Sequence, residues 1–262
     1  CGEYGPGRMA EPDEILGAIL RELRPRGPLT GRRILVTSGP THEPIDPVRY
    51  IANRSSGAQG SAIAEALSVL GADVVFITGP ATAPDPWGVE IHRVESAREM
   101  LAAVEASLPA EAAICAAAVA DWRVEQASDS KIKKDPKRPV ATLSMTENPD
   151  ILATLSKLPA ARRPHLVVGF AAETDDVVEN ATAKRARKGC DWIVANDVSP
   201  GTGIMGGTEN AVTLVTPEGA EAWPRAPKAE VARRLSARVA EALLSAPKGG
   251  RSGGPRRARS AS

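Results

Sequence analysis

The chain is poor in aromatic residues and has no excess of charge of one sign. Phe, Trp and Tyr make up only 3% of its 262 residues, and its formal net charge is +1. Proteins that bind single-stranded nucleic acid combine aromatic stacking platforms with a basic groove. The composition indicates neither, so we expect no nucleic-acid partner.

Paired cysteines, histidine clusters and long apolar runs are also absent from the sequence. The three cysteines, Cys1, Cys115 and Cys190, have no CxxC spacing; without a recognisable signal peptide they favour a reduced, cytoplasmic setting. The three histidines form no HxH or HExxH motif, so no zinc site is indicated and any metal ligands stay unknown. The longest apolar run, 112–120, is too short to span a bilayer and predicts a buried strand with its loop.

Strand-like and helix-like patterns alternate along most of the chain. This alternation predicts an α/β fold: a Rossmann-like, three-layer, doubly wound, mostly parallel sheet with helices on both faces. Ligands of such sheets bind outside the carboxyl ends of the strands. The predicted strands are 33–37, 73–78, 89–94, 112–118, 140–145, 165–170, 191–195 and 211–216, and the predicted helices are 57–70, 96–107, 149–158, 175–188 and 227–244.

We predict one domain over residues 29–245, with extensions at both ends. Residues 1–28 contain a short helix over 13–23, with apolar residues at helical spacing, and then a linker rich in Pro and Gly. Residues 246–262 are mainly Gly, Ser, Pro and basic residues, without an acid. We expect this tail to be a disordered, solvated end, in preference to a tether for nucleic acid or membrane.

The most informative stretch is 46–57 (DPVRYIANRSSG), between the first predicted strand and the first predicted helix of the domain. A strand, a loop of small polar residues and a helix N-terminus make an anion site, because free N–H groups and the positive helix end point at one place. A purely structural turn seldom needs so many polar side chains. Four of them are predicted to crowd this place: Arg49, Asn53, Ser55 and Ser56.

An NAD(P)-dependent oxidoreductase is the weaker alternative. No GxGxxG follows the first strand, and the second strand ends at Thr78 without an acid for a ribose. A short-chain dehydrogenase would need Tyr-x-x-x-Lys, but Tyr50 is followed by Arg54 at that spacing. A third alternative is a non-catalytic module that binds a nucleotide without turnover.

Further polar segments follow the later strands. The small residues of 115–118 would let a planar ring approach the backbone, and Asp121 could accept from an amino group; the alternative is an alanine-rich core strand. The lysines of 131–134 indicate a flap that brings cations to a polyphosphate, or merely solvated charge.

The last candidate segments are a helix start, a strand end and the helix that follows that strand. Asn148 is predicted to cap a helix whose first residue is Pro149. Phe170 would be either core or the wall of a base pocket. Lys184 and Lys188 share one helix face at i, i+4, directed at phosphates or at solvent.

In this order the segments resemble the phosphopantothenate–cysteine ligases, the synthetase half of the bifunctional bacterial coenzyme A biosynthesis proteins. The resemblance runs from about Leu29 to Ala242, and no single motif would be specific without the others. The motifs that carry it are 39–41, 43–49, 53–57, 117–121, 131–134, 148–151, 169–174 and 195–197.

The resemblance implies a two-step reaction. The carboxylate of 4′-phosphopantothenate attacks the α-phosphate of CTP, which is favoured over ATP, and pyrophosphate leaves an acyl-cytidylate. The amine of L-cysteine then displaces CMP to form the amide. Mg²⁺ would offset the phosphate charge. The resemblance also implies a homodimer in which the neighbour may complete each site.

Residue roles are implied position by position. Asn53 would hold the acyl-cytidylate and assist the second step, Arg49 would position the substrate, and Lys131 would serve the first step. The sequence departs from the family at Ala58 and Gln59, where Lys or Arg and then Met are common, so one phosphate-facing charge is missing. The implied CTP-binding residues are Cys115, Ala116, Ala117, Asp121, Lys131, Pro149, Asp150, Ile151, Leu152, Phe170, Lys184 and Lys188, and the implied phosphate and substrate loop comprises Gly39, Thr41, Ser55, Ser56 and Gly57.

The first residues, 1–12, resemble the end of a flavin-dependent decarboxylase domain, in which Cys1 would be the acid. We therefore expect the chain to be part of a longer fused protein. FMN would belong only to that upstream domain.

Overall fold

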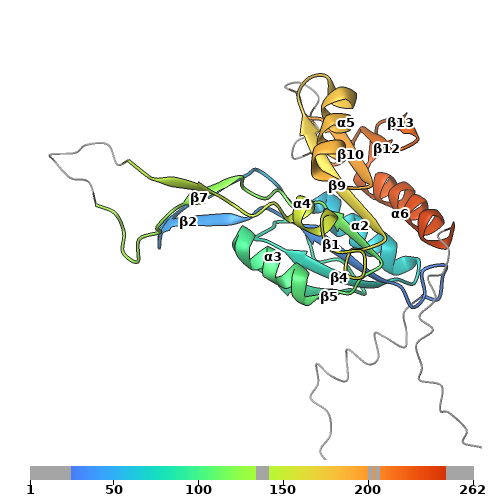
Figure 1. Cartoon of the computed structure of the whole chain (residues 1–262), viewed down its shortest axis with the longest axis horizontal. Coiled ribbons are helices and arrows are strands. Elements are labelled where there is room, and N and C mark those ends of the chain that lie inside the picture. Colours follow the sequence, from blue (N-terminus) through green and yellow to red (C-terminus); the bar gives the residue numbers. More distant parts are fainter. Residues whose placement is uncertain (1–24, 134–141, 200–202, 204–206, 246–262) are drawn as a thin grey trace, which may run out of the picture.

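The computed structural model describes residues 25–133, 142–199, 203 and 207–245, and its centre is an eight-stranded sheet (Figure 1). The sheet order is β13-β12-β10-β9-β6-β1-β4-β5. The strands from β10 to β5 are mutually parallel, whereas β12 and β13 form an antiparallel edge. The mostly parallel sheet is thereby confirmed. Its strands are β1 (Arg33–Ser38), β4 (Asp73–Thr78), β5 (Glu90–Arg93), β6 (Ala112–Cys115), β9 (Leu166–Glu173), β10 (Trp192–Asp197), β12 (Val212–Thr216) and β13 (Gly219–Ala222).

Helices cover both faces of the sheet, as predicted. Alternate residues of β1 show the division: Ile34 and Val36 pack in the core beneath one helix pair, and Leu35 packs in the core on the other face. Such burial on both faces explains why the strands read as continuous apolar runs. One face carries α2 (Ala58–Val69) and α6 (Lys228–Ser245), and the other carries α3 (Ala97–Ala106), α4 (Ile151–Ser156) and α5 (Val177–Lys188).

The start of α4 differs from the prediction. Asp150, not Asn148, is the N-cap, because its side chain accepts a hydrogen bond from the Ala153 N–H at 2.9 Å. The Asn148 amide instead donates to the Ala120 carbonyl oxygen at 2.9 Å. Pro149 therefore precedes the helix, and Asn148 ties the start of α4 to the loop after β6.

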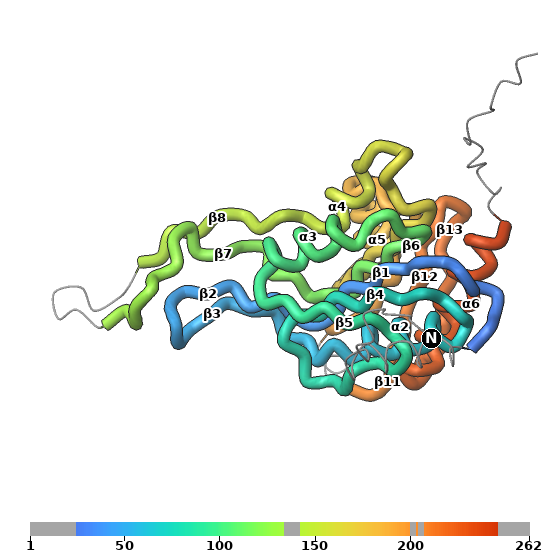
Figure 2. Tube along the Cα trace, turned by 90° about the horizontal axis from the view of Figure 1, so that it is seen from below, coloured from blue at the N-terminus to red at the C-terminus, as the bar shows by residue number. Residues whose placement is uncertain are grey.

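Two hairpins form an arm that projects to one side of the sheet (Figures 1 and 2). One pairs β2 (His42–Asp46) with β3 (Arg49–Ala52), and the other pairs β7 (Trp122–Val124) with β8 (Met145–Glu147). The prediction of a plain loop after β1 was therefore wrong. Of the sheet strand predicted over 140–145, residues 140 and 141 lie outside the described residues, and of the rest only Met145 is in a strand, β8, which does not join the main sheet. Both hairpins expose much of their surface, so they lack the alternating pattern that marks half-buried strands.

The remaining elements are short. β11 (Glu209–Asn210) pairs with β14 (Ala226–Pro227) just before α6. Within the described part of the chain, no helix is long and apolar enough to cross a membrane. The predicted helix over 13–23 and the tail 246–262 lie outside the described residues, and the domain limits stay a prediction.

Candidate active site

A cleft with two lobes lies along the carboxyl edge of the parallel strands. The first lobe has a volume of about 430 Å³ and the second about 530 Å³. Loops after several parallel strands contribute to it, as expected for an open α/β sheet. Five residues line both lobes and so mark their junction: Ala117, Val119, Asp121, Phe170 and Lys184.

The first lobe gathers most of the residues implied for CTP. The ends of β6 and β9, the start of α4 and one face of α5 surround it. Ala116 and Lys131 are the exceptions, because Ala116 lines the second lobe and Lys131 lines neither. Those in the first lobe are Cys115, Ala117, Asp121, Pro149, Asp150, Ile151, Leu152, Phe170, Lys184 and Lys188.

The two lysines of α5 differ in their partners. Lys188 forms an ion pair with Asp150. Desolvation opposes ionisation of Asp150, but Lys188 and the Ala153 N–H together hold the pKa of that carboxyl below its usual range. Lys184 forms no ion pair with any described residue, and desolvation lowers the pKa of its ammonium despite the attraction of Glu173 and Asp121. Lys184 is thus the cation left available at the junction.

Cys115 is a wall of the first lobe rather than a nucleophile. Desolvation raises the pKa of its thiol to about 12. The thiolate is the reactive form of cysteine, so this side chain stays protonated and serves as a small apolar contact.

Gly39 and Thr41 do not line either lobe; they support the loop after β6. The Gly39 carbonyl oxygen accepts from the Ala118 N–H at 2.9 Å. The fully buried Thr41 hydroxyl accepts from the Ala120 N–H at 3.0 Å. These bonds hold the alanine-rich segment open to the cleft.

The second lobe contains Asn53, Ser55, Ser56 and Gly57, as the sequence predicted for one anion site. The Asn53 amide Nδ2 donates to the Val119 carbonyl oxygen at 2.9 Å, which places this side chain beside the junction. Gly57 adopts φ 77°, a left-handed conformation that favours glycine, and it precedes α2 without any side-chain cap. The first turn of α2 therefore opens onto the lobe.

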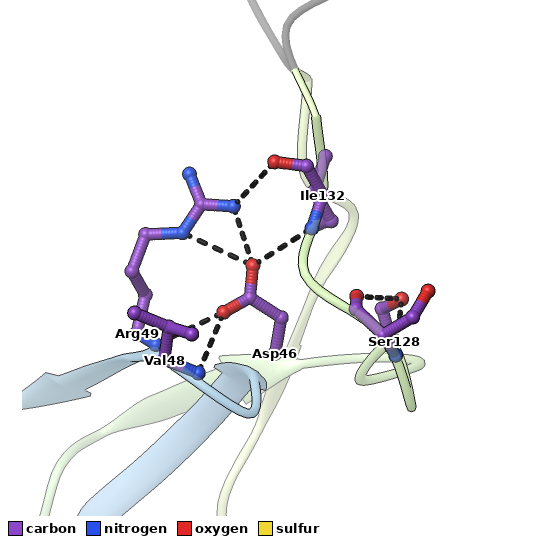
Figure 3. Close-up of polar contacts among 6 residues, drawn as sticks. Asp46, Val48, Arg49, Ser128 and Ile132 are labelled. Atoms are coloured by element: carbon purple, nitrogen blue, oxygen red, sulfur yellow. Dashed lines mark hydrogen bonds and ion pairs between the residues drawn. The ribbon is translucent and has the colours of Figure 1, made fainter.

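Arg49 lies on the arm and does not join that site within one chain. Its guanidinium contacts the carboxylate of Asp46, with Nε to Oδ2 at 3.0 Å, and donates to the Ile132 carbonyl oxygen at 3.0 Å (Figure 3). The expectation that Arg49 crowds Asn53 and the serines was therefore wrong, because the β2–β3 hairpin carries Arg49 away.

Lys131 is also an exposed residue of the arm, next to Ile132. The Ile132 N–H donates to Asp46 at 3.1 Å, and Asp46 itself is buried. Hydrogen bonds from Arg49 lower the pKa of Asp46 far below its usual value. Asp46 thus fastens the start of the predicted flap to the hairpin, and Lys134 lies outside the described residues.

Several residues of the second lobe were not among the predicted site residues, and they include Asn196, Asn210 and Lys228. Asn196 was noted only as a polar strand end. The sequence offered one signal that Lys228 belongs to a functional site. A cation at the first residue of a helix lies at the positive end of the helix dipole, where it is unfavourable.

Comparison with known proteins agrees with this arrangement. A family model described as the DNA/pantothenate metabolism flavoprotein C-terminal domain matches residues 29–243. The chain belongs to this family. The coenzyme A biosynthesis bifunctional proteins CoaBC of Vibrio cholerae and Escherichia coli K12 are each 44% identical to it, over 225 and 226 residues.

Those alignments cover 86% of this chain in both cases, and 56% and 55% of the two relatives. The chain therefore spans a little over half the length of these curated members. A crystal structure of the C-terminal domain of CoaBC is 36% identical, has a TM-score of 0.70 and covers 84% of this chain and 100% of that one. The fold and the family predicted from the sequence motifs are confirmed.

Proposed function

We propose that this chain joins 4′-phosphopantothenate to L-cysteine through an acyl-cytidylate, with CTP as co-substrate. One observation carries the proposal: the cleft collects, from separate segments of the chain, the residue types that this chemistry requires. Membership of a family whose relatives are named as coenzyme A biosynthesis proteins supports it.

We assign the nucleotide to the first lobe. Phe170 would provide the wall for the base, and Asp121 an acceptor for an amino group. Lys184, which has no ion-pair partner among the described residues, would face the phosphates. The α-phosphate would then lie at the junction, next to Asn53 and the second lobe.

The carboxylate is a poor acyl donor, so the reaction first makes it a mixed anhydride. A carboxylate oxygen forms a bond to the α-phosphorus of CTP while the bond to pyrophosphate breaks. The cysteine nitrogen then bonds to the acyl carbon, loses a proton, and CMP leaves. The amide N–H of Asn53 would stabilise the negative oxygen of the second step, a role that requires a prearranged donor.

Mg²⁺ fits the donors available. The described residues hold no group of three or more His, Cys, Asp or Glu side chains arranged for a metal. Mg²⁺ is commonly held by one or two carboxylates together with phosphate oxygens and water. Phosphate oxygens and water would therefore supply most of its ligands, and the ion would supply charge neutralisation for the leaving pyrophosphate.

The arm supports a homodimer. Arg49 and Lys131 lie outside both lobes of their own chain, although the family resemblance gives them roles in catalysis. The arm also exposes Val48, Tyr50, Trp122 and Met145 by 60%, 54%, 58% and 44%, an apolar surface of the kind that protein interfaces cover. We propose that each arm completes the site of a second copy. A flavin-dependent decarboxylase domain as covalent partner, and a cytoplasmic location, stay predictions.

Pyrophosphate release tests the function. The protein is incubated with 4′-phosphopantothenate, Mg²⁺ and either CTP or ATP, with and without cysteine. Sustained release that requires both CTP and cysteine is expected. Release with ATP alone would overturn the choice of nucleotide, and binding of CTP without any release would favour the non-catalytic module.

A further inference from the structure

The segment after β6 stays paired with the chain that follows β1. The Ala118 N–H donates to the Gly39 carbonyl oxygen at 2.9 Å, and Pro40 and Ala118 form a parallel bridge. Two residues further on, a continued parallel ladder would use the backbone carbonyl of Thr41. The structure uses the hydroxyl of Thr41 instead, which accepts from the Ala120 N–H at 3.0 Å. Because β2 starts at the next residue, this side chain extends the pairing to the point where the arm begins.

One peptide group joins this contact to the second lobe. The Ala120 N–H and the Val119 carbonyl belong to the same trans peptide. A trans peptide is planar and its N–H and C=O point in opposite directions, so holding one end fixes the other. Thr41 holds the N–H at 3.0 Å, and the carbonyl oxygen accepts from Asn53 Nδ2 at 2.9 Å. The orientation of the Asn53 side chain is therefore linked to a buried hydroxyl.

The Val119 carbonyl selects which end of the Asn53 carboxamide faces it. A carbonyl oxygen only accepts hydrogen bonds, so it takes the NH₂ end. Within the described part of the chain, Val119 accepts the only hydrogen bond that the Asn53 side chain donates, and the second hydrogen of Nδ2 is left for a ligand. Without this contact the carboxamide is free to turn about its last bond and present Oδ1 there, which would repel the negative oxygen of the second step.

The next peptide along the chain is held separately. Asn148 Nδ2 donates to the Ala120 carbonyl oxygen at 2.9 Å, and the Asn148 N–H donates to the Asp121 carbonyl oxygen at 2.8 Å. Loss of the Thr41 hydroxyl would therefore leave this loop in place, with one N–H deprived of its acceptor. Ala120 is only 2% exposed, and a buried N–H without a partner is costly. Rotation of the Val119–Ala120 peptide relieves this cost and removes the acceptor of Asn53.

We propose that Thr41 is a positioning residue that acts through the Val119–Ala120 peptide. It sets the orientation of the Asn53 carboxamide and thereby controls the amide-forming step. The inference rests on the proposed function. Thr41 itself cannot contact a substrate, because it is fully buried and lines neither lobe. Since Asn53 is assigned to the second step, the two steps of the reaction should respond differently to a change at Thr41.

The test measures the two steps separately in Thr41→Val, which keeps the shape of the side chain and removes the hydroxyl. Without cysteine, the burst of pyrophosphate reports formation of the acyl-cytidylate, and its rate should stay within about twofold of the wild type. When cysteine is added, the amide should form about 10- to 100-fold more slowly, because a misplaced catalytic group costs about 100-fold. Equal slowing of both steps would overturn the proposal, and so would an unchanged rate of amide formation.

A double-mutant cycle shows whether Thr41 acts through Asn53. Asn53→Ala removes the carboxamide, and in this background Thr41→Val should slow the amide step by less than about twofold, because residues that act as a unit are not additive. Thr41→Ser keeps the acceptor and should restore the wild-type rate within about threefold. If Thr41→Val slowed this step equally with and without Asn53, the proposal would fail. Thr41→Ala provides the same readouts if the Val variant does not fold.

Ser68→Ala is the matched control. Ser68 Oγ also bonds a loop backbone group, the Gly88 carbonyl oxygen at 3.1 Å, and this side chain is 1% exposed and lines neither lobe. The variant should lose stability in urea, yet both steps should stay within about twofold of the wild type. Selective slowing of the amide step in Ser68→Ala would show that the loss of any buried hydroxyl is sufficient, which contradicts a specific role of Thr41.

Nuclear magnetic resonance separates this proposal from the proposed function. The side-chain amide signal of Asn53 is identified as the one missing from Asn53→Ala. It should shift in Thr41→Val and stay unchanged in Ser68→Ala. This readout needs no turnover, so it still tests the link between Thr41 and Asn53 if the wild type forms no amide and the ligase assignment fails. An unmoved Asn53 signal in Thr41→Val would overturn the proposal.

Discussion

Gly60 is the residue that lets the first turn of α2 approach the end of β1. A Cβ atom at this position would lie 2.3 Å from Ser38 Oγ and 2.6 Å from Ser38 Cβ. Both distances are far below van der Waals contact, and the Cβ atom cannot rotate away, because the backbone of the buried strand β1 fixes its position. Gly60→Ala must therefore move the start of α2.

The expected loss of stability follows from three opposing effects. Overpacking costs about 1–3 kcal/mol. The hydrogen bond from Ser38 Oγ to the Gly57 carbonyl oxygen, 3.0 Å long, contributes about 1 kcal/mol and would be strained or lost. Alanine returns about 1 kcal/mol through its higher helix propensity. We expect Gly60→Ala to lower the free energy of unfolding by about 1–3 kcal/mol, and the melting temperature by about 2–12 °C for a domain of this size.

A double-mutant cycle identifies the clash as the cause. Ser38→Gly removes the two nearest atoms that a Cβ at position 60 would meet. It costs about 1 kcal/mol for a glycine in a strand and about 1 kcal/mol more for the lost hydrogen bond to the Gly57 carbonyl oxygen. In that background Gly60→Ala should be neutral or stabilising by up to about 1 kcal/mol, which gives a coupling free energy of about 1–4 kcal/mol. Urea denaturation of the four proteins measures it. If Gly60→Ala lowered the free energy of unfolding equally in both backgrounds, the predicted clash with Ser38 would be refuted.

The remaining predictions concern the arm and the cleft. Asn53→Asp and Lys131→Gln should each be inactive, yet mixed and co-refolded they should regain about a quarter of wild-type activity if each site combines two chains of a C₂ dimer; no recovery would contradict shared sites. In the wild type, kcat/KM for CTP should fall as pH rises, with a midpoint below the ordinary lysine pKa of 10.5, because desolvation lowers the pKa of Lys184. This fall should vanish in Lys184→Arg, since arginine keeps its proton, and its persistence would assign the titration elsewhere. Asp46→Ala should speed hydrogen exchange at the Ile132 N–H, which it would leave without its acceptor, and unchanged exchange would show that Asp46 does not fasten the flap.

The sheet was predictable because its strands are buried on both faces. Continuous apolar runs such as 34–36 and 112–115, separated by amphipathic helices, specify parallel strands and their connections. The arm was not predictable in the same way. Its strands are short and largely exposed, and the short turn at Pro47 and Val48 depends on Asp46, whose Oδ1 accepts from the N–H groups of Val48 and Arg49.

The candidate site was predicted best where residues follow parallel strands directly. Cys115, Asp121 and Phe170 meet in one lobe because strand ends share an edge of the sheet. Arg49 was misplaced because strand β3 extends between Arg49 and Asn53 and places these two residues at its opposite ends. Lys228 was missed because it comes from the far end of the chain, and only the packing of α6 against α2 brings it to the second lobe.

Transfer of a labelled oxygen tests the central claim most directly. The protein is given 4′-phosphopantothenate with isotopically heavy oxygen in its carboxylate, together with CTP, Mg²⁺ and cysteine, and the products are weighed by mass spectrometry. The account predicts one CMP with one heavy oxygen for each amide formed, because the carboxylate oxygen bonds to phosphorus and leaves with CMP. Unlabelled CMP, or amide formed without CMP, would contradict it.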